Sequence, residues 1–233
     1  MKKPTLGLAA LLVASLLRSE DLHERAMRLH RSAIIVDTHE DVPESLEQKW
    51  RDLSVRNTVG HTDIPRWREG GVTAPFLAAY VQAEYAKSGG AGKKALEFID
   101  LIHRLVETYP KDLVFTDSVA GIRQAKKDGK IGILIGIEGG HAIEDSLGAL
   151  SSFYRLGVRY MTLTHTNTNN WADSSGNFFT ADFDPKKYEI HDGLNDLGRK
   201  VVAEMNRLGM LVDVSHVSPA TIRDVLEVST APV

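Results

Sequence analysis

Four side chains in the sequence have the types and positions expected of metal ligands: His39, Asp41, Glu138 and His216. Imidazole nitrogens and carboxylate oxygens are donors that hydrolytic metal sites use. His39 and Asp41 are separated by one residue, so in an extended chain both side chains point to the same side. By its spacing alone this pair is equally typical of a solvated strand end. The sequence contains no cysteine, which excludes disulfides and thiolate metal sites. These residues therefore predict a hydrolytic metal such as zinc, held by histidine and carboxylate.

The candidate ligands lie where apolar runs end, and such runs predict β-strands. The most informative run, 131–137, is almost wholly apolar and β-branched, as in a strand buried on both faces of a parallel sheet, and it ends at Glu138. A helical pattern over 143–154, closed by Gly157, leads to the next apolar run, so this stretch predicts a βαβ unit. Active sites of α/β barrels are built at the ends of the strands that bear such residues.

Five apolar runs predict five barrel strands, over residues 33–37, 72–81, 131–137, 158–164 and 210–214. Residues 231–233 resemble the start of a sixth strand. The predicted fold class is α/β; strands that alternate with helices in this way are typical of a (β/α)8 TIM-type barrel, which would be incomplete here because a closed barrel needs eight strands. We expect residues 20–233 to form the N-terminal part of a single barrel catalytic domain. An open arc has an unpaired edge, which favours aggregation or pairing with another chain, for example in a homodimer.

Three segments carry a resemblance to a known family: Glu138-Gly-Gly-His141, Gly157-Val-Arg-Tyr160 and Thr162-Leu-Thr-His165. Together with Leu150 and Tyr154, they resemble the signature segment of the membrane dipeptidases, also called renal dipeptidases. The resemblance extends over residues 32–233. It implies that the barrel is of the metal-dependent hydrolase type. It also implies a zinc-dependent hydrolase of the metalloprotease class, acting in proteolysis, whose substrate is a dipeptide.

The resemblance also assigns roles to single residues. It implies two zinc ions bridged by Glu138. His39 and Asp41 would hold the first ion, and His216 would hold the second. His165 matches the family's catalytic histidine, which contacts the substrate and stabilises the tetrahedral oxyanion. A further histidine ligand, a substrate-binding arginine and a catalytic aspartate of the family would all lie beyond the end of this sequence, so an inactive fragment is one outcome that the sequence allows.

Two other functions stay open at this point. One is another metal-dependent amidohydrolase, acting on a lactone, a cyclic amide or a phosphoester. An H-x-H pair on the first strand and a carboxylated lysine bridge would favour it, whereas this chain has His39 and Asp41 in an H-x-D pair and Glu138 as the candidate bridge. The other is a non-catalytic binding or scaffold protein derived from the same fold.

The remaining candidate residues are weaker. His61 and Asp63 repeat the H-x-D spacing but follow no apolar run, so we interpret them as loop residues. His103 lies on the apolar face of a predicted helix and is typical of a histidine at the edge of a core. His191 precedes a helix start without a clear role. Asp213 lies within a predicted strand, which favours a structural role.

Composition and the N-terminus limit the partners and the location. The formal net charge is −3 and there is no basic block, so nucleic acid is excluded as an expected partner. Residues 6–17 form an apolar run after Lys2 and Lys3, too short for a membrane span of about 20 residues but suited to a signal peptide over residues 1–19. We therefore predict export to the periplasm or the extracellular space. A buried N-terminal helix and a cytoplasmic location are the alternative.

Overall fold

The structure is a computed structural model, and it describes residues 21–233. The predicted signal peptide, residues 1–19, lies outside the described residues. The strands are β1 (Val36–Glu40), β2 (Ala74–Tyr80), β3 (Leu113–Phe115), β4 (Ile131–Glu138), β5 (Val158–Thr162) and β6 (Leu211–Asp213). The α-helices are α2 (Leu22–Ser32), α3 (Val42–Gln48), α4 (Ile64–Glu69), α5 (Tyr85–Ser88), α6 (Ala91–Thr108), α7 (Val119–Lys127), α8 (Leu147–Arg155), α9 (Asp196–Leu208) and α10 (Pro219–Val228). Two 3₁₀ helices are η1 (Gly140–Ile143) and η2 (Pro185–Tyr188). Within the described range, no helix has the length and apolar character needed to span a bilayer.

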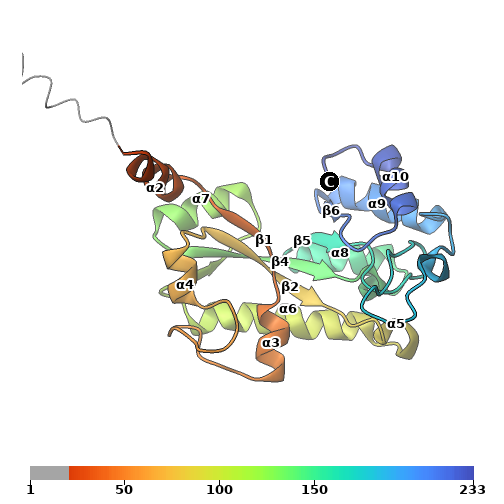
Figure 1. Cartoon of the computed structure of the whole chain (residues 1–233), viewed down its shortest axis with the longest axis horizontal. Coiled ribbons are helices and arrows are strands. Elements are labelled where there is room, and N and C mark those ends of the chain that lie inside the picture. The colour runs from red at the N-terminus through yellow and green to blue at the C-terminus, as the bar shows by residue number, and fades with distance from the viewer. Residues whose placement is uncertain (1–20) are drawn as a thin grey trace, which may run out of the picture.

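The strands form one parallel sheet in the order β1-β2-β4-β5-β6, with helices between successive strands (Figure 1). The sheet curls into half of a barrel, which confirms the predicted fold class. The five strands on this path are the five that the apolar runs predict. The short strand β3 was not predicted; it pairs with the first half of β4, and β5 pairs with the second half. Residues 231–233 form no strand, so the expected start of a further strand there is absent.

The stretch after β4 also differs from its prediction. A continuous helix over 143–154 is wrong, because η1 ends at Ile143 and α8 begins only at Leu147. Between them Glu144 and Asp145 have positive φ angles of 47° and 59°, which end the first helix. Ser146 then caps α8, where its side chain accepts a hydrogen bond from a backbone N–H group of the first turn.

Strand β4 divides its side chains between the two faces of the sheet. Ile133, Ile135 and Ile137 belong to the large core that the sheet forms with the surrounding helices. The alternate residues face the concave side, where Leu134 packs in a smaller cluster with Phe76 and Tyr160. Because side chains alternate along a strand, Glu138 lies on this concave side, at the carboxyl end.

Strand register places the inward-facing side chains in two layers. The layer at the carboxyl ends of the strands contains Tyr80, Glu138, Thr162 and Asp213. The layer below it contains Ala78, Gly136, Tyr160 and Leu211. The upper layer is polar, as expected for the catalytic end of a barrel.

Candidate metal centre

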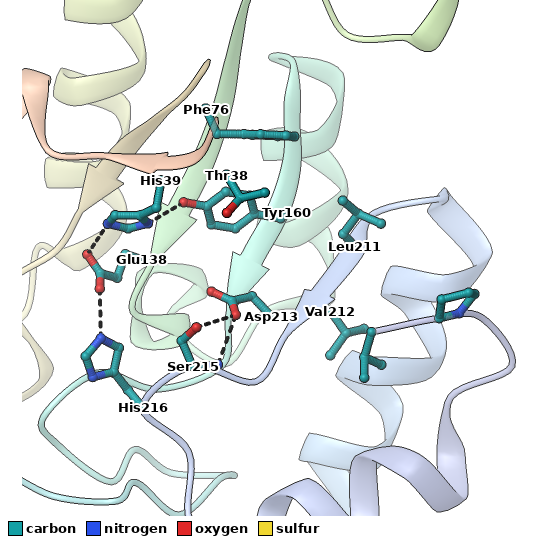
Figure 2. A pocket seen from close by; sticks show the side chains of 12 residues that line it. Thr38, His39, Phe76, Glu138, Tyr160, Leu211, Val212, Asp213, Ser215 and His216 are labelled. Carbon is teal, nitrogen blue, oxygen red and sulfur yellow. Dashed lines mark hydrogen bonds and ion pairs between the residues drawn. The ribbon is translucent and has the colours of Figure 1, made fainter. Parts of the chain in front are cut away.

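Glu138 is the centre of the site. Its side chain is only 8% exposed, although it is charged. One carboxylate oxygen, Oε2, lies 3.4 Å from Nε2 of His39, and the other, Oε1, lies 3.2 Å from Nε2 of His216. Figure 2 shows the carboxylate between the two imidazoles. The two oxygens of Glu138 therefore face two separate groups of donors.

The first group consists of His39, Asp41 and Glu138, whose donor atoms lie within 4.8 Å of one another. Nε2 of His39 is 3.1 Å from Oδ1 of Asp41. His39 lies near the end of β1, and Asp41 lies between β1 and α3, where its side chain makes no capping hydrogen bond. The structure thus brings the H-x-D pair of the sequence to Glu138, with the Asp41 carboxylate open to solvent.

The second group consists of Glu138, His165 and His216, again with donor atoms within 4.8 Å. The rings of His165 and His216 are 4.4 Å apart between centroids. Nε2 of His165 lies 3.6 Å from Oε1 of Glu138, and its Nδ1 lies 3.4 Å from the hydroxyl of Tyr80. The five residues selected from the sequence therefore meet at one end of the sheet, while their roles as ligands or catalyst stay predictions.

His216 is held in a backbone conformation that side-chain-bearing residues seldom adopt. Its φ angle is +62°. Its carbonyl oxygen accepts hydrogen bonds from the Thr164 hydroxyl at 3.0 Å, from the Ser175 N–H at 2.8 Å and from two serine hydroxyls. These bonds over-determine the strained position, which is the usual condition for such strain at a functional site. They were not predicted, although the Ser-rich run after His165 supplies two of the three hydroxyls.

The pKa values show how strongly the donors interact without a cation. Hydrogen bonds to Asp41 and Glu138 raise the pKa of His39 to about 10. Burial acts to raise the pKa of Glu138, but hydrogen bonds from His216 and His39 outweigh it and lower the pKa to about 2. Burial lowers the pKa of His165, so this ring is neutral near pH 7. Protons thus occupy the space between paired donors, and histidine with carboxylate is a donor set that fits a divalent cation there.

A cavity of about 370 Å³ opens beside the two donor groups, on the concave side of the sheet. Its lining includes Glu138, His216 and the ring of Tyr160 (Figure 2). Asp213 also lines it and accepts hydrogen bonds from Thr162 Oγ1 and from the residue two positions later. The volume suits a small polar molecule, and the polar groups gather at one end of it.

The other candidate histidines lie outside both groups. Asp63 is fully buried and caps helix α4, where it also pairs with Arg66, so it is not available as a ligand beside His61. His103 bonds to a backbone carbonyl of the α8 end, and His191 bonds to the carbonyl of Asn169.

The loop after His165 is more ordered than a solvated surface loop. Trp171 and Asp173 are fully buried in it, and Asp173 accepts hydrogen bonds from three backbone N–H groups of the segment before α9. The side-chain oxygen of Asn169 accepts hydrogen bonds from the backbone N–H groups of Trp171 and Ala172, which turns the loop back on itself. Through the hydroxyl of Ser174 this loop also contacts the backbone carbonyls of His165 and His216.

Comparison with known proteins gives a consistent result. The family described as membrane dipeptidase (peptidase family M19) matches residues 23–233. Dipeptidase 3 of Homo sapiens is 44% identical over 218 residues, and Dipeptidase 3 of Mus musculus is 42% identical over 217 residues. The match covers 91% of this chain but only 43% and 42% of those proteins. The chain thus spans less than half the length of these curated relatives.

Solved structures share the fold. A metallopeptidase from Rhodobacter sphaeroides, crystallised with a phosphinate mimic of the dipeptide L-Ala-D-Ala, is 25% identical with a TM-score of 0.74. The match covers 86% of this chain and 63% of that one. The probable dipeptidase PvdM from Pseudomonas aeruginosa has a TM-score of 0.78 at 22% identity, over 90% of this chain and 53% of that one. The half-barrel seen here corresponds to a part of those larger chains.

Proposed function

Because the chain belongs to the membrane dipeptidase family, peptidase family M19, we propose that it carries the metal centre of a dipeptide-hydrolysing enzyme. The observation that supports this most strongly is the position of Glu138. Its two oxygens face two separate groups of histidine and carboxylate donors, at 3.4 Å on one side and 3.2 Å on the other. One carboxylate placed in this way is suited to bridge two cations.

In this proposal His39 and Asp41 hold the first ion, His216 holds the second, and Glu138 contributes to both. Zinc fits the donor set, since the ligands are imidazole and carboxylate and none is a thiolate. Two bound zinc ions would supply an acidified water molecule as nucleophile and would polarise the carbonyl of the scissile bond.

His165 is assigned to the substrate and not to a metal ion. Burial raises the pKa of Tyr80 to about 12, so its hydroxyl keeps its proton, and in the proposed arrangement it donates that proton to Nδ1 of His165, 3.4 Å away. The neutral imidazole then carries its own proton on Nε2, the nitrogen on the side of Glu138. An N–H group there can donate to the oxyanion that forms at the attacked carbonyl.

The assignment has a direct test. Removing one oxyanion donor typically costs about 2.7–4 kcal/mol of barrier. The His165→Ala variant should therefore hydrolyse dipeptides roughly a hundred- to a thousandfold more slowly while its zinc content, measured by mass spectrometry of the metal, equals that of the wild type. Loss of zinc in this variant would instead make His165 a ligand.

The other amidohydrolase functions have less support. No lysine lines the two cavities that border the donor groups, and Glu138 takes the place where such enzymes would need a carboxylated lysine. Hydrolysis of dipeptides is thus preferred to hydrolysis of lactones, cyclic amides or phosphoesters.

Activity is tested with the chain loaded with zinc and supplied with L-Ala-L-Ala, L-Ala-D-Ala or tri-alanine, with release of alanine as the readout. We expect both dipeptides to be cleaved and the tripeptide to be spared, with Glu138→Gln inactive as the control. A wild-type chain that binds zinc but cleaves none of them would be an inactive fragment or a non-catalytic relative, and dipeptide hydrolysis by this chain would be refuted. A chain that binds no zinc would refute the proposed metal centre itself.

Location and assembly belong to the same proposal. The composition of residues 1–19 supports export, which is tested by comparing the N-terminal sequence and the location of the expressed protein with those of a chain starting at residue 20. Among the described strands, β1 pairs only with β2 and β6 only with β5. A homodimer in which such an edge pairs with a second copy is the assembly proposed, and the strands of a longer chain would cover the same edges. Light scattering after gel filtration decides between monomer and dimer.

A further inference from the structure

Tyr160 lies directly below the first donor group, and its neighbours leave space for its aromatic ring. It is in the middle of β5, on the concave side, and is 4% exposed. The residue beside it on β4 is Gly136. A Cβ atom on Gly136 would lie 2.0 Å from Cζ of Tyr160, so only glycine at this position lets the ring lie across β4.

The ring reaches over β4 to β1. It packs against Phe76 of β2 with 5.1 Å between centroids, and it is stacked on His39 of β1 at 6.3 Å and 29° between ring planes. Its hydroxyl then lies 2.8 Å from Nδ1 of His39, a contact between residues 121 positions apart in the sequence (Figure 2). The ring is thus placed mainly by the space above Gly136 and by packing on Phe76, neither of which is a candidate ligand.

The groups around the second ring nitrogen of His39 determine which partner donates in this hydrogen bond. Nε2 of His39 faces the oxygens of Asp41 and Glu138, at 3.1 Å and 3.4 Å. When Nε2 carries a proton it donates to these carboxylates, and when it binds a cation it carries none. With a cation on Nε2 the proton of the neutral imidazole is on Nδ1, and an imidazolium carries a proton on both nitrogens, so in either form the Nδ1–H group needs an acceptor. The hydroxyl oxygen of Tyr160 is the acceptor in reach.

We propose that Tyr160 is a positioning residue of the metal centre, whose hydroxyl oxygen accepts the Nδ1 proton of His39 and so holds Nε2 toward Asp41 and Glu138. The inference rests on the proposed function in one respect, namely that His39 binds a metal ion. Outer hydrogen-bond partners of this kind fix the tautomer and orientation of a histidine ligand, and their loss typically weakens metal binding by roughly 10- to 100-fold. The usual acceptor for such a histidine N–H group is a carboxylate or a backbone carbonyl, and here it is a tyrosine hydroxyl.

The test uses Tyr160→Phe, which removes one oxygen and keeps the ring that packs on Phe76. The matched control is Tyr109→Phe. The hydroxyl of Tyr109 accepts a hydrogen bond from Leu53 N and donates one to Asp52 Oδ1, and both partners lie in the loop before α4. Zinc binding is measured by calorimetry on both variants and on the wild type, and a His39→Ala variant identifies the binding step that depends on His39.

We expect that step to weaken roughly 10- to 100-fold in Tyr160→Phe and to remain unchanged in Tyr109→Phe, with thermal unfolding confirming that both variants fold. A second readout uses the metal-free protein and nitrogen-15 NMR of the His39 ring. The Nδ1–H signal should be protected from exchange with water in the wild type and in Tyr109→Phe, and it should be lost in Tyr160→Phe.

Equal zinc affinity of Tyr160→Phe and the wild type would overturn the inference, because the hydroxyl would then only fill space. A wild-type chain that binds no zinc would refute the proposed function. The NMR measurement would still decide on Tyr160 in that case, since an unchanged Nδ1–H signal in Tyr160→Phe would show that the hydroxyl does not hold the His39 ring.

Discussion

Replacing Glu138 by glutamine tests the arrangement of the site most directly. The substitution keeps the size of the side chain and removes its charge. A carboxylate accepts hydrogen bonds at both oxygens, whereas an amide has one oxygen and one NH₂ group. In Glu138→Gln, either His39 or His216 therefore meets a donor where it now meets an acceptor. The His39 imidazolium, whose side chain is 35% exposed, also loses one of its two carboxylates.

The size of the effect follows from the pKa of Glu138, which is about 2 instead of 4.5. One pKa unit corresponds to about 1.4 kcal/mol, so the folded protein favours the carboxylate by roughly 3 kcal/mol. Losing this interaction should lower the free energy of unfolding by about that amount, which is within the range for breaking one partner of a buried ion pair.

Urea denaturation of the metal-free protein at pH 6 measures this difference. Glu69→Gln is the control, because Glu69 pairs with Arg56 at the surface with 68% of its side chain exposed, and such pairs contribute less than about 1 kcal/mol. Zinc at a hundred times its dissociation constant should stabilise the wild type by about 2.7 kcal/mol and Glu138→Gln hardly at all. A metal-free Glu138→Gln variant that is as stable as the wild type, or more stable, would refute the reasoning, since the carboxylate would then be strained by its neighbours.

Three further predictions concern the metal-free protein. The pKa of His39 is raised from 6.5 to about 10 and that of Glu138 is lowered from 4.5 to about 2. The contribution of His39 to the free energy of unfolding is complete below pH 6.5 and is lost as the pH rises toward 10. The contribution of Glu138 is complete above pH 4.5 and is lost as the pH falls through 2. Urea denaturation at different pH values should thus show the greatest stabilisation by this pair between pH 4.5 and pH 6.5. A His39→Gln variant whose stability has the same pH profile as the wild type would contradict this. Gly140→Ala should lower the free energy of unfolding by about 1–3 kcal/mol, because its Cβ would lie 2.4 Å from the backbone oxygen of Leu163; an unchanged melting temperature would count against the close packing. Ser218→Ala should cost about 1 kcal/mol through loss of the α10 cap and Ser218→Gly only a few tenths, so equal losses in the two variants would exclude the capping explanation.

The sequence predicts those features of the fold that depend on local pattern. The apolar run before Glu138 identifies β4, because a strand covered on both faces reads as a continuous apolar segment. The cap formed by Ser218 is likewise a local signal. The three-residue strand β3 was missed because its pattern is too short to distinguish from a loop, and it depends on β4 for its hydrogen bonds.

Features that depend on strand register could not be predicted. The contact between Tyr160 and His39 needs the space above Gly136, and that space exists only once β4 and β5 are aligned. The left-handed conformation of His216 depends on hydroxyl groups from a loop some 40 residues earlier. Both arrangements are long-range, so composition and periodicity do not reveal them, even where the residues that take part are polar and recognisable.

Strand β4 is the most extensively paired strand among those described, with β2 along one edge and β3 and β5 along the other, and all eight of its residues are buried. Its amide hydrogens should therefore be among the last to exchange with solvent, whereas β1, paired only with β2 through an irregular register, should open earlier. Local opening of β1 would carry His39 and Asp41 away while Glu138 stays in place. His39 and Asp41 would then leave the centre before the other donors do. The carboxylate of Glu138 would stay in place, and the first donor group would re-form around it.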